Sequence, residues 1–244
     1  MISTTSQAEN PLIYHLRDVV KTREAEGVSF RLSVPSLKIA MGEKIALVGK
    51  SGCGKSTLLD MLAFILQPSE VGVFSFQPEC EEESLDIHTY WKAGKLNQLG
   101  DLRKHYIGYV MQTGGLLPYL TVRENMNLSR SVLGLRPDGM VEHLAEELGL
   151  TAHLDKLPDK LSTGERQRVA IGRAVAHRPS IVIADEPTAS IDPFAAEKVM
   201  SMFIGLAEEF KITVILASHA WDPVSYTHLT LPTIILPCRS RWAA

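Results

Sequence analysis

The chain has 244 residues, of which 45% are hydrophobic and 22% are charged. This composition excludes a disordered or collagen-like chain and suits one compact globular domain. The 25 basic residues against 28 acidic ones give a formal net charge of −3, which argues against nucleic acid as a partner because phosphate-binding surfaces usually carry a basic excess. Three cysteines without metal-ligand spacing indicate a reducing cytosol, and no apolar run reaches the roughly 18–20 residues that span a bilayer.

Short runs rich in valine and isoleucine alternate along the chain with longer segments of helical character. The runs typical of buried parallel strands cover residues 45–49, 107–111, 181–185 and 213–218. The helical segments cover residues 55–66, 140–148, 165–177 and 194–210. This alternation predicts an α/β fold whose sheet is mainly parallel.

A glycine-rich segment lies directly between the first of these strands and the first helix. It reads GKSGCGKST and matches the phosphate-loop pattern G-x-x-x-x-G-K-[ST] in the strand–helix context that the pattern requires. Glycines let backbone N–H groups approach phosphate oxygens, the lysine can reach the β- and γ-phosphates, and the serine hydroxyl after it can ligate Mg²⁺. The predicted nucleotide-binding residues are Gly49, Lys50, Ser51, Gly52, Cys53, Gly54, Lys55, Ser56 and Thr57.

An acidic pair ends the apolar run at residues 181–184. Asp185 suits the second half of a magnesium site. Glu186 follows directly and could polarise the water that attacks the γ-phosphate. The chain has no N-K-x-D guanine-binding sequence, which argues against a GTPase.

The segment at residues 161–174 reads LSTGERQRVAIGRA. It resembles the signature motif L-S-G-G-Q of the ATP-binding cassette (ABC) ATPases, with Thr163 in place of a glycine and Glu165 in place of the glutamine. The resemblance implies that Ser162, Gly164 and Glu165 contact ATP, with the Ser162 hydroxyl and the Gly164 backbone meeting the γ-phosphate.

Three further segments are similar to ABC elements and follow in the family's order. Gln112 resembles the glutamine that senses Mg²⁺ and the permease, and the sequence Ser-Ile-Asp at residues 190–192 resembles the D-loop, which adds Asp192 to the nucleotide contacts. His219 resembles the switch histidine at the γ-phosphate. The resemblance thus implies the catalytic residues Glu186, His219 and Gln112. The magnesium ligands that it implies are Ser56, Gln112 and Asp185.

The family also stacks an aromatic side chain on adenine. Phe30 is the first choice for this role and Tyr14 the second. Simple packing in the core is an equally good interpretation of both residues.

The resemblance covers residues 12–222 and implies a P-loop NTPase core with an α-helical subdomain inserted at about 113–161. It also implies a head-to-tail dimer with a second ABC ATPase copy, identical or homologous, in which the signature motif of one copy closes over the ATP of the other. The expected partner is an integral-membrane permease, which would hold the protein peripherally on the cytoplasmic face of the cell membrane. The apolar segment 113–127 is the candidate docking surface, and packing inside the helical subdomain is an equally good interpretation of it. Residues 109–127 are closest in style to the lipoprotein-release, macrolide-export and cell-division ATPases.

Other functions remain open at this point. A non-transport ABC ATPase that signals mechanically to a membrane or cell-wall partner would share every motif. A soluble ATPase acting on DNA or ribosomes is disfavoured by the single cassette and the acidic charge. A P-loop kinase would need the phosphate loop but neither the signature motif nor His219.

The last stretch of the chain, residues 223–244, differs from everything before it. Residues 224–233 read VSYTHLTLPT and residues 238–242 read CRSRW, and both resemble the translation of a sequencing-library adapter. We therefore expect the natural reading frame to end near Asp222 and the tail to be non-native. The alternative is a genuine edge strand rich in threonine, leucine and proline.

Overall fold

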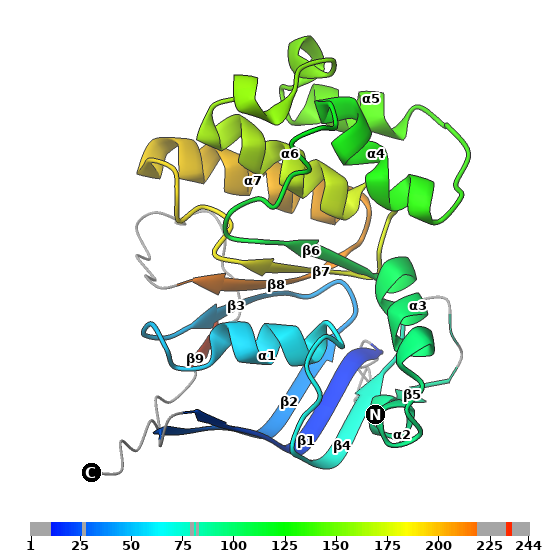
Figure 1. The fold of residues 1–244 in the computed structure, drawn as a ribbon, viewed down its shortest axis with the longest axis vertical. Helices are drawn as coiled ribbons and strands as arrows, with labels where there is room; N and C mark the ends of the chain where they lie inside the picture. The colour runs from blue at the N-terminus through cyan, green and yellow to red at the C-terminus, as the bar shows by residue number, and fades with distance from the viewer. Residues whose placement is uncertain (1–10, 26–27, 79–80, 82, 219–232, 236–244) are drawn as a thin grey trace, which may run out of the picture.

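The computed structural model describes residues 11–25, 28–78, 81, 83–218 and 233–235, and within them two β-sheets and their helices form stacked layers (Figure 1). One sheet is antiparallel, with strand order β2-β1-β4-β5, and the other is parallel, with order β6-β7-β8-β3-β9. The antiparallel sheet contains β1 (Leu12–Ala25), β2 (Val28–Ala40), β4 (Glu70–Phe76) and β5 (Leu85–Asp86). The parallel sheet contains β3 (Lys44–Val48), β6 (Ile107–Val110), β7 (Ile181–Asp185), β8 (Thr213–Ser218) and β9 (Thr233–Ile235).

Helices cover both faces of the parallel sheet (Figure 1). Helix α1 (Lys55–Leu62) lies between the two sheets. Two helices, α2 (Ile87–Lys92) and α3 (Leu96–Tyr106), follow the antiparallel sheet and lead directly into β6. The opposite face carries α4 (Val122–Val132), α5 (Met140–Glu147), α6 (Thr163–Val175) and α7 (Pro193–Glu209), with the short 3-10 helices η1 (Thr151–His153) and η2 (Pro158–Lys160) between α5 and α6.

The parallel strands are apolar on both sides because both sides are buried. In β7, Ile181 and Ile183 belong to the apolar cluster with α1 and the antiparallel sheet, whereas Val182 and Ala184 belong to the cluster with helices α4 to α7. Successive side chains of a strand point to opposite faces, so a strand covered on both faces has an uninterrupted apolar run. This is the pattern by which the sequence predicted the parallel sheet.

Most predicted elements are found with small shifts at their ends. The strands expected at residues 181–185 and 213–218 have these bounds, and β3 and β6 each end one residue earlier than expected. Helices α5, α6 and α7 match the predicted segments within one or two residues. The helix predicted at 55–66 was too long: it ends at Leu62, because Phe64 has a left-handed φ of 57°.

The antiparallel sheet and helices α2, α3 and α4 were not predicted. Strand β1 pairs with β4 in a register that joins Tyr14 to Phe76. Such a pairing depends on residues far apart in the chain and leaves no local signal in the sequence.

Strand β9 lies within the tail that the sequence analysis expects to be non-native. It pairs in parallel with β3, joining Ala46 to Thr233 and Val48 to Ile235. The unpaired backbone groups at a sheet edge accept extended segments of many sequences, so the position of β9 fits a native or a foreign tail.

Over the described part of the chain, the helices are all too short or too polar to cross a membrane.

Candidate functional site

The predicted site residues gather where the parallel strands end. Strands β6, β7, β8 and β3 are neighbours in register, with Val110 opposite Ala184, Asp185 opposite Ala217 and Val48 opposite Ser218. The loops that follow these strands therefore leave the sheet at one edge, where α/β proteins bind their ligands. Gln112 lies two residues beyond β6 with an exposed side chain. His219, expected directly after β8, lies outside the described residues.

The glycine-rich loop between β3 and α1 needs its glycines for two reasons. Gly52 and Gly54 have φ angles of 75° and 105°, a region that L side chains rarely adopt. A Cβ atom on Gly54 would also lie 3.0 Å from the Phe30 ring and 3.1 Å from Leu32. The loop thus turns tightly into the N-terminus of α1, and a helix N-terminus favours bound anions.

The side chain of Lys55, the first residue of α1, folds back onto this loop. Its ammonium group donates hydrogen bonds to the carbonyl oxygens of Gly49 at 2.7 Å and Lys50 at 3.3 Å, and lies 3.9 Å from the Glu186 carboxylate. The two side chains are only 4% and 7% exposed. Burying the two opposite charges side by side offsets part of the cost of removing each from water.

Glu186 has an unusual backbone. Its φ is 49°, in the left-handed region, and its N–H donates to the Ala217 carbonyl oxygen at 3.1 Å. A non-glycine residue in this region costs about 1 kcal/mol or more and persists where the surrounding structure imposes it. The strained turn aims the Glu186 carboxylate at Lys55 instead of letting the strand continue.

The neighbouring Asp185 fits a hard cation. Its Oδ1 atom is buried and has no hydrogen-bond partner among the described residues, whereas Ser56, on the first turn of α1, is exposed. Carboxylate and hydroxyl oxygens suit Mg²⁺, which keeps several waters and is usually shared with substrate phosphates. No group of three or more histidine, cysteine or acidic side chains in the described chain could hold a metal ion without such help.

Sequence reasoning missed two side chains beside Asp185. The Tyr109 hydroxyl donates to Asp60 Oδ1 at 3.4 Å. Burial raises the pKa of the Asp60 carboxyl, the Tyr109 hydrogen bond lowers it, and the charge of Asp185 raises it again. Burial likewise raises the pKa of the Tyr109 hydroxyl. The sequence offered one signal, an acidic residue one turn after Ser56 in a predicted helix.

The structure separates the two candidates for adenine stacking. Phe30 is half-buried and its ring lies over Gly54 of the phosphate loop. Tyr14 is fully buried in the core, and its hydroxyl donates to the Leu62 carbonyl oxygen at 2.6 Å. The expectation for Tyr14 was therefore wrong, because its ring is enclosed by Phe64, Phe74 and Phe76.

The signature segment forms the N-terminus of α6. The Ser162 hydroxyl accepts a hydrogen bond from the Glu165 N–H at 3.3 Å, and the Ser162 N–H donates to the Glu165 carboxylate at 2.7 Å. This reciprocal pair is a capping box, and the hydrogen bonds that Ser162 makes to the Glu165 carboxylate, from its backbone N–H first, lower the pKa of Glu165. Asp192 caps α7 in a similar way by accepting from Ala195 N–H at 3.0 Å. The Ile191 side chain next to it reaches Gly164.

Two side chains that the sequence did not single out hold the loop after Gln112. Asn125, fully buried in α4, accepts from the Leu117 N–H and donates to the carbonyl oxygens of Leu117, Leu120 and Thr121. Arg173 of α6 donates to the carbonyl oxygens of Gly114 and Gly115, both at 2.8 Å. The loop is therefore fixed by its backbone, while the Tyr119 side chain at its tip is 72% exposed.

Comparisons with known proteins bear on this arrangement. The family model described as "ABC transporter" matches residues 32–189. The lipoprotein-releasing system ATP-binding protein LolD of Acinetobacter baylyi is 37% identical over 75% of this chain and 78% of its own length. The macrolide export ATP-binding/permease protein MacB of Syntrophobacter fumaroxidans is 37% identical over 77% of this chain and 25% of its own length. The solved dimer of the ATP-binding cassette MJ0796, bound to ADP and Pi, is 29% identical and superposes with a TM-score of 0.69 over 85% of this chain and 88% of that one.

Proposed function

The chain belongs to the ABC transporter family, and from this premise we propose that two copies of it bind Mg-ATP head to tail and hydrolyse it to drive a membrane permease. As a member of this family the chain is an ATP-binding ATPase subunit. The observation that carries the proposal is the buried pair of Lys55 and Glu186, 3.9 Å apart beside Asp185 and the phosphate loop.

Each side chain near the carboxyl ends of the parallel strands has a distinct role in this proposal. Backbone N–H groups of residues 49–57 bind the phosphates, and Lys55 exchanges its loop carbonyls for the β- and γ-phosphate oxygens. Glu186 orients and polarises the attacking water, assisted by Gln112 and His219. Mg²⁺, when bound, neutralises charge on the phosphates; Ser56, Asp185 and Gln112 are the residues that would hold it. Phe30, over the loop, supplies the face on which adenine stacks.

The second copy completes the site. Ser162, Gly164 and Glu165 lie at an exposed or half-exposed helix N-terminus, with Asp192 nearby. A helix N-terminus favours anions, so this surface suits the γ-phosphate of an ATP held by the other copy. The solved cassette to which the chain is similar forms a dimer bound to ADP and Pi, which supports this arrangement.

Hydrolysis and closure can be tested with one substitution. In Glu186→Gln the amide cannot accept a proton, so turnover is expected to fall by about 10²- to 10⁴-fold, while ATP binding persists and the ATP-bound dimer accumulates. Steady-state phosphate release and sedimentation with and without Mg-ATP measure both effects. Full turnover by Glu186→Gln would remove Glu186 from this role.

The segment at residues 113–127, which contains the loop after Gln112 and the first turns of α4, is the proposed docking surface for the permease. Asn125 and Arg173 fix its backbone while Tyr119 stays exposed, as a preformed contact surface requires. The relatives named LolD and MacB support a permease of the lipoprotein-release or macrolide-export group and a position on the cytoplasmic face of the membrane. Loss of co-purification with the permease on Tyr119→Asp, with ATP hydrolysis retained, is the expected result.

The domain boundaries belong to the same proposal. Residues 12–222 would form the cassette, about 113–161 its helical subdomain, and 223–244 a non-native tail. Sequencing the source locus across the codon for Asp222 tests the tail. A natural reading frame that continues past Asp222 with a different sequence, next to a gene that encodes membrane-spanning helices, supports the proposal. A genome that encodes VSYTHLTLPT at this position contradicts it.

A further inference from the structure

The signature segment of this chain departs from L-S-G-G-Q at two positions, and each new side chain has a partner. The Thr163 hydroxyl accepts a hydrogen bond from Arg166 at 3.1 Å. The Glu165 carboxylate lies 3.1 Å from His153 Nε2, and the two side chains are 21% and 24% exposed. A carboxylate at this position carries the same sign of charge as the triphosphate that a second copy is proposed to bring to the same helix N-terminus.

The contacts of His153 determine which of its nitrogens carries the proton. Lys156 Nζ lies 2.8 Å from His153 Nδ1. An ammonium group can only donate, so Nδ1 accepts and the proton is on Nε2. Nε2 therefore donates to Glu165 Oε1, while Glu165 Oε2 accepts from the Ser162 N–H at 2.7 Å. Both oxygens of the carboxylate are thus held by donors of this chain.

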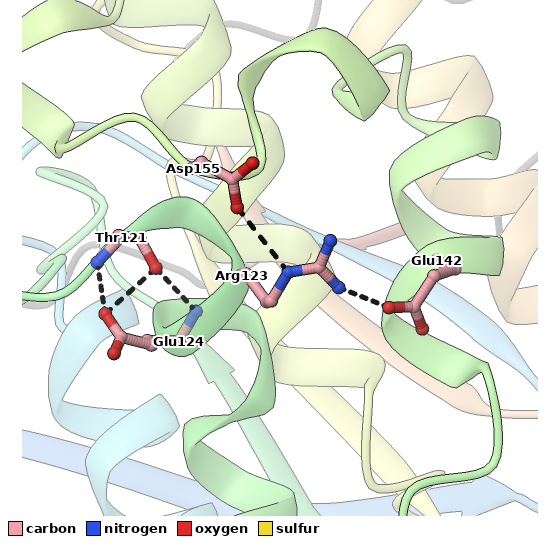
Figure 2. Close-up of polar contacts among 5 residues, drawn as sticks. All are labelled: Thr121, Arg123, Glu124, Glu142 and Asp155. Atoms are coloured by element: carbon pink, nitrogen blue, oxygen red, sulfur yellow. Dashed lines mark hydrogen bonds and ion pairs between the residues drawn. The ribbon is translucent and has the colours of Figure 1, made fainter.

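His153 itself lies on a segment clamped to α4. The Arg123 and Val122 N–H groups donate to the carbonyl oxygens of Leu154 and Lys156, both at 2.9 Å. Figure 2 shows the Arg123 guanidinium between Asp155, 3.8 Å away, and Glu142 of α5. It also shows the capping box of Thr121 and Glu124 that begins α4. The position of His153 is therefore tied to α4, whose first turns belong to the proposed docking segment.

We propose that His153 is a positioning residue for the signature motif: by holding the Glu165 carboxylate on the α6 N-terminus, it orients Ser162 and keeps the carboxylate from opposing the ATP of the second copy. The proposal rests on the head-to-tail dimer described above. A Glu165 carboxylate bound at both oxygens cannot turn toward an incoming γ-phosphate. Without His153, one oxygen is released beside that phosphate and like charges repel.

The test is a double-mutant cycle on ATP-driven dimerisation in the Glu186→Gln chain. His153→Ala is expected to weaken the Mg-ATP dimer about threefold to tenfold in sedimentation equilibrium, since one partly exposed charge-assisted hydrogen bond is lost. The same change in a Glu165→Gln background is expected to have less than about a twofold effect, because the carboxylate is gone. His153→Gln keeps an N–H donor and is expected to restore most of the dimer.

Two controls separate this role from a structural one. His143 pairs with Glu209 at 2.8 Å in the same helical layer, away from the signature motif, and His143→Ala is expected to dimerise like the parent. ATP affinity at protein concentrations too low for dimers, measured by fluorescence titration, is expected to stay unchanged in His153→Ala. Parent-like dimerisation of His153→Ala, or an equal loss in both backgrounds, overturns the role of His153 alone. A parent that stays monomeric at saturating Mg-ATP overturns the proposed dimer as well.

Discussion

The two surfaces proposed to enclose ATP are built in opposite ways. At the carboxyl ends of the parallel strands, Lys55 and Glu186 are almost completely buried and face each other across 3.9 Å. At the N-terminus of α6, Ser162 is exposed and is held by bonds to its neighbours in sequence. Buried charges are already desolvated and held in place, so the first surface can bind nucleotide within one chain. The exposed surface can contribute only when a second copy covers it.

The largest expected effect lies at the buried surface. Lys55→Ala removes the buried ammonium of the loop and is expected to weaken ATP binding about 100-fold or more, since a desolvated charge-assisted contact is lost. Isothermal titration measures the affinity. Lys44, at the opposite end of β3, supplies the matched control, and Lys44→Ala is expected to bind ATP like the parent. Near-normal affinity of Lys55→Ala would show that Lys55 does not contact the phosphates.

The helical side also depends on one buried polar group. Asn125→Ala leaves the backbone groups of Leu117, Leu120 and Thr121 without their amide partner, and is expected to cost about 3 kcal/mol of unfolding free energy. Urea denaturation measures this loss, and chymotrypsin is expected to cut faster at Tyr119. Asn127 on the same helix bonds only Ser131 among the described contacts, so Asn127→Ala should cost less than about 1 kcal/mol. Equal losses from both variants would contradict the role of Asn125.

A buried histidine between helix α6 and strand β7 predicts that the stability of the fold depends on pH. His177 lies between α6 and β7 and is buried; burial lowers its pKa by more than a backbone hydrogen bond at Ile107 raises it. Burial lowers the pKa of His177 to about 4, below its usual value of about 6.5. Above pH 6.5 the imidazole is neutral in both the folded and unfolded states. Between pH 6.5 and about 4 only the unfolded state takes up the proton, so stability falls as the pH falls.

The expected loss through His177 is about 2 kcal/mol between pH 6.5 and pH 5. Urea denaturation at several pH values measures it as a slope. His177→Leu is expected to remove that slope, whereas His143→Ala, at a half-exposed histidine, is expected to keep it. An unchanged slope in His177→Leu would assign the pH dependence to other groups.

The smallest expected effect lies at the exposed surface. Ser162→Ala is expected to lower turnover about tenfold and to cost about 1 kcal/mol of stability through the lost N-cap, with ATP affinity of the single chain unchanged. Thr121→Ala removes the equivalent cap of α4 and should show the same stability loss at normal turnover. Normal turnover in Ser162→Ala would show that the Ser162 hydroxyl does not contribute to the ATP site of the second copy.

Much of the site was predictable because its motifs are local. The phosphate loop, the acidic pair and the signature segment each occupy one strand–loop–helix or loop–helix unit, where the spacing of a few residues decides the chemistry. The parallel strands were predictable for a similar reason, because burial on both faces leaves an apolar run. The antiparallel sheet was not, since β1 and β4 join residues such as Tyr14 and Phe76 from distant parts of the chain.

The sequence by itself determined the fold class, the nucleotide chemistry and the family. Only the tertiary structure decided that Phe30 lies over the phosphate loop while Tyr14 is enclosed in the core, and that His153 Nε2 lies 3.1 Å from the Glu165 carboxylate. Arg173 holds the carbonyl of Gly114 across 59 residues. Contacts of this kind depend on how elements pack rather than on spacing, because a side chain's partner is chosen by what the folded chain brings within hydrogen-bond distance.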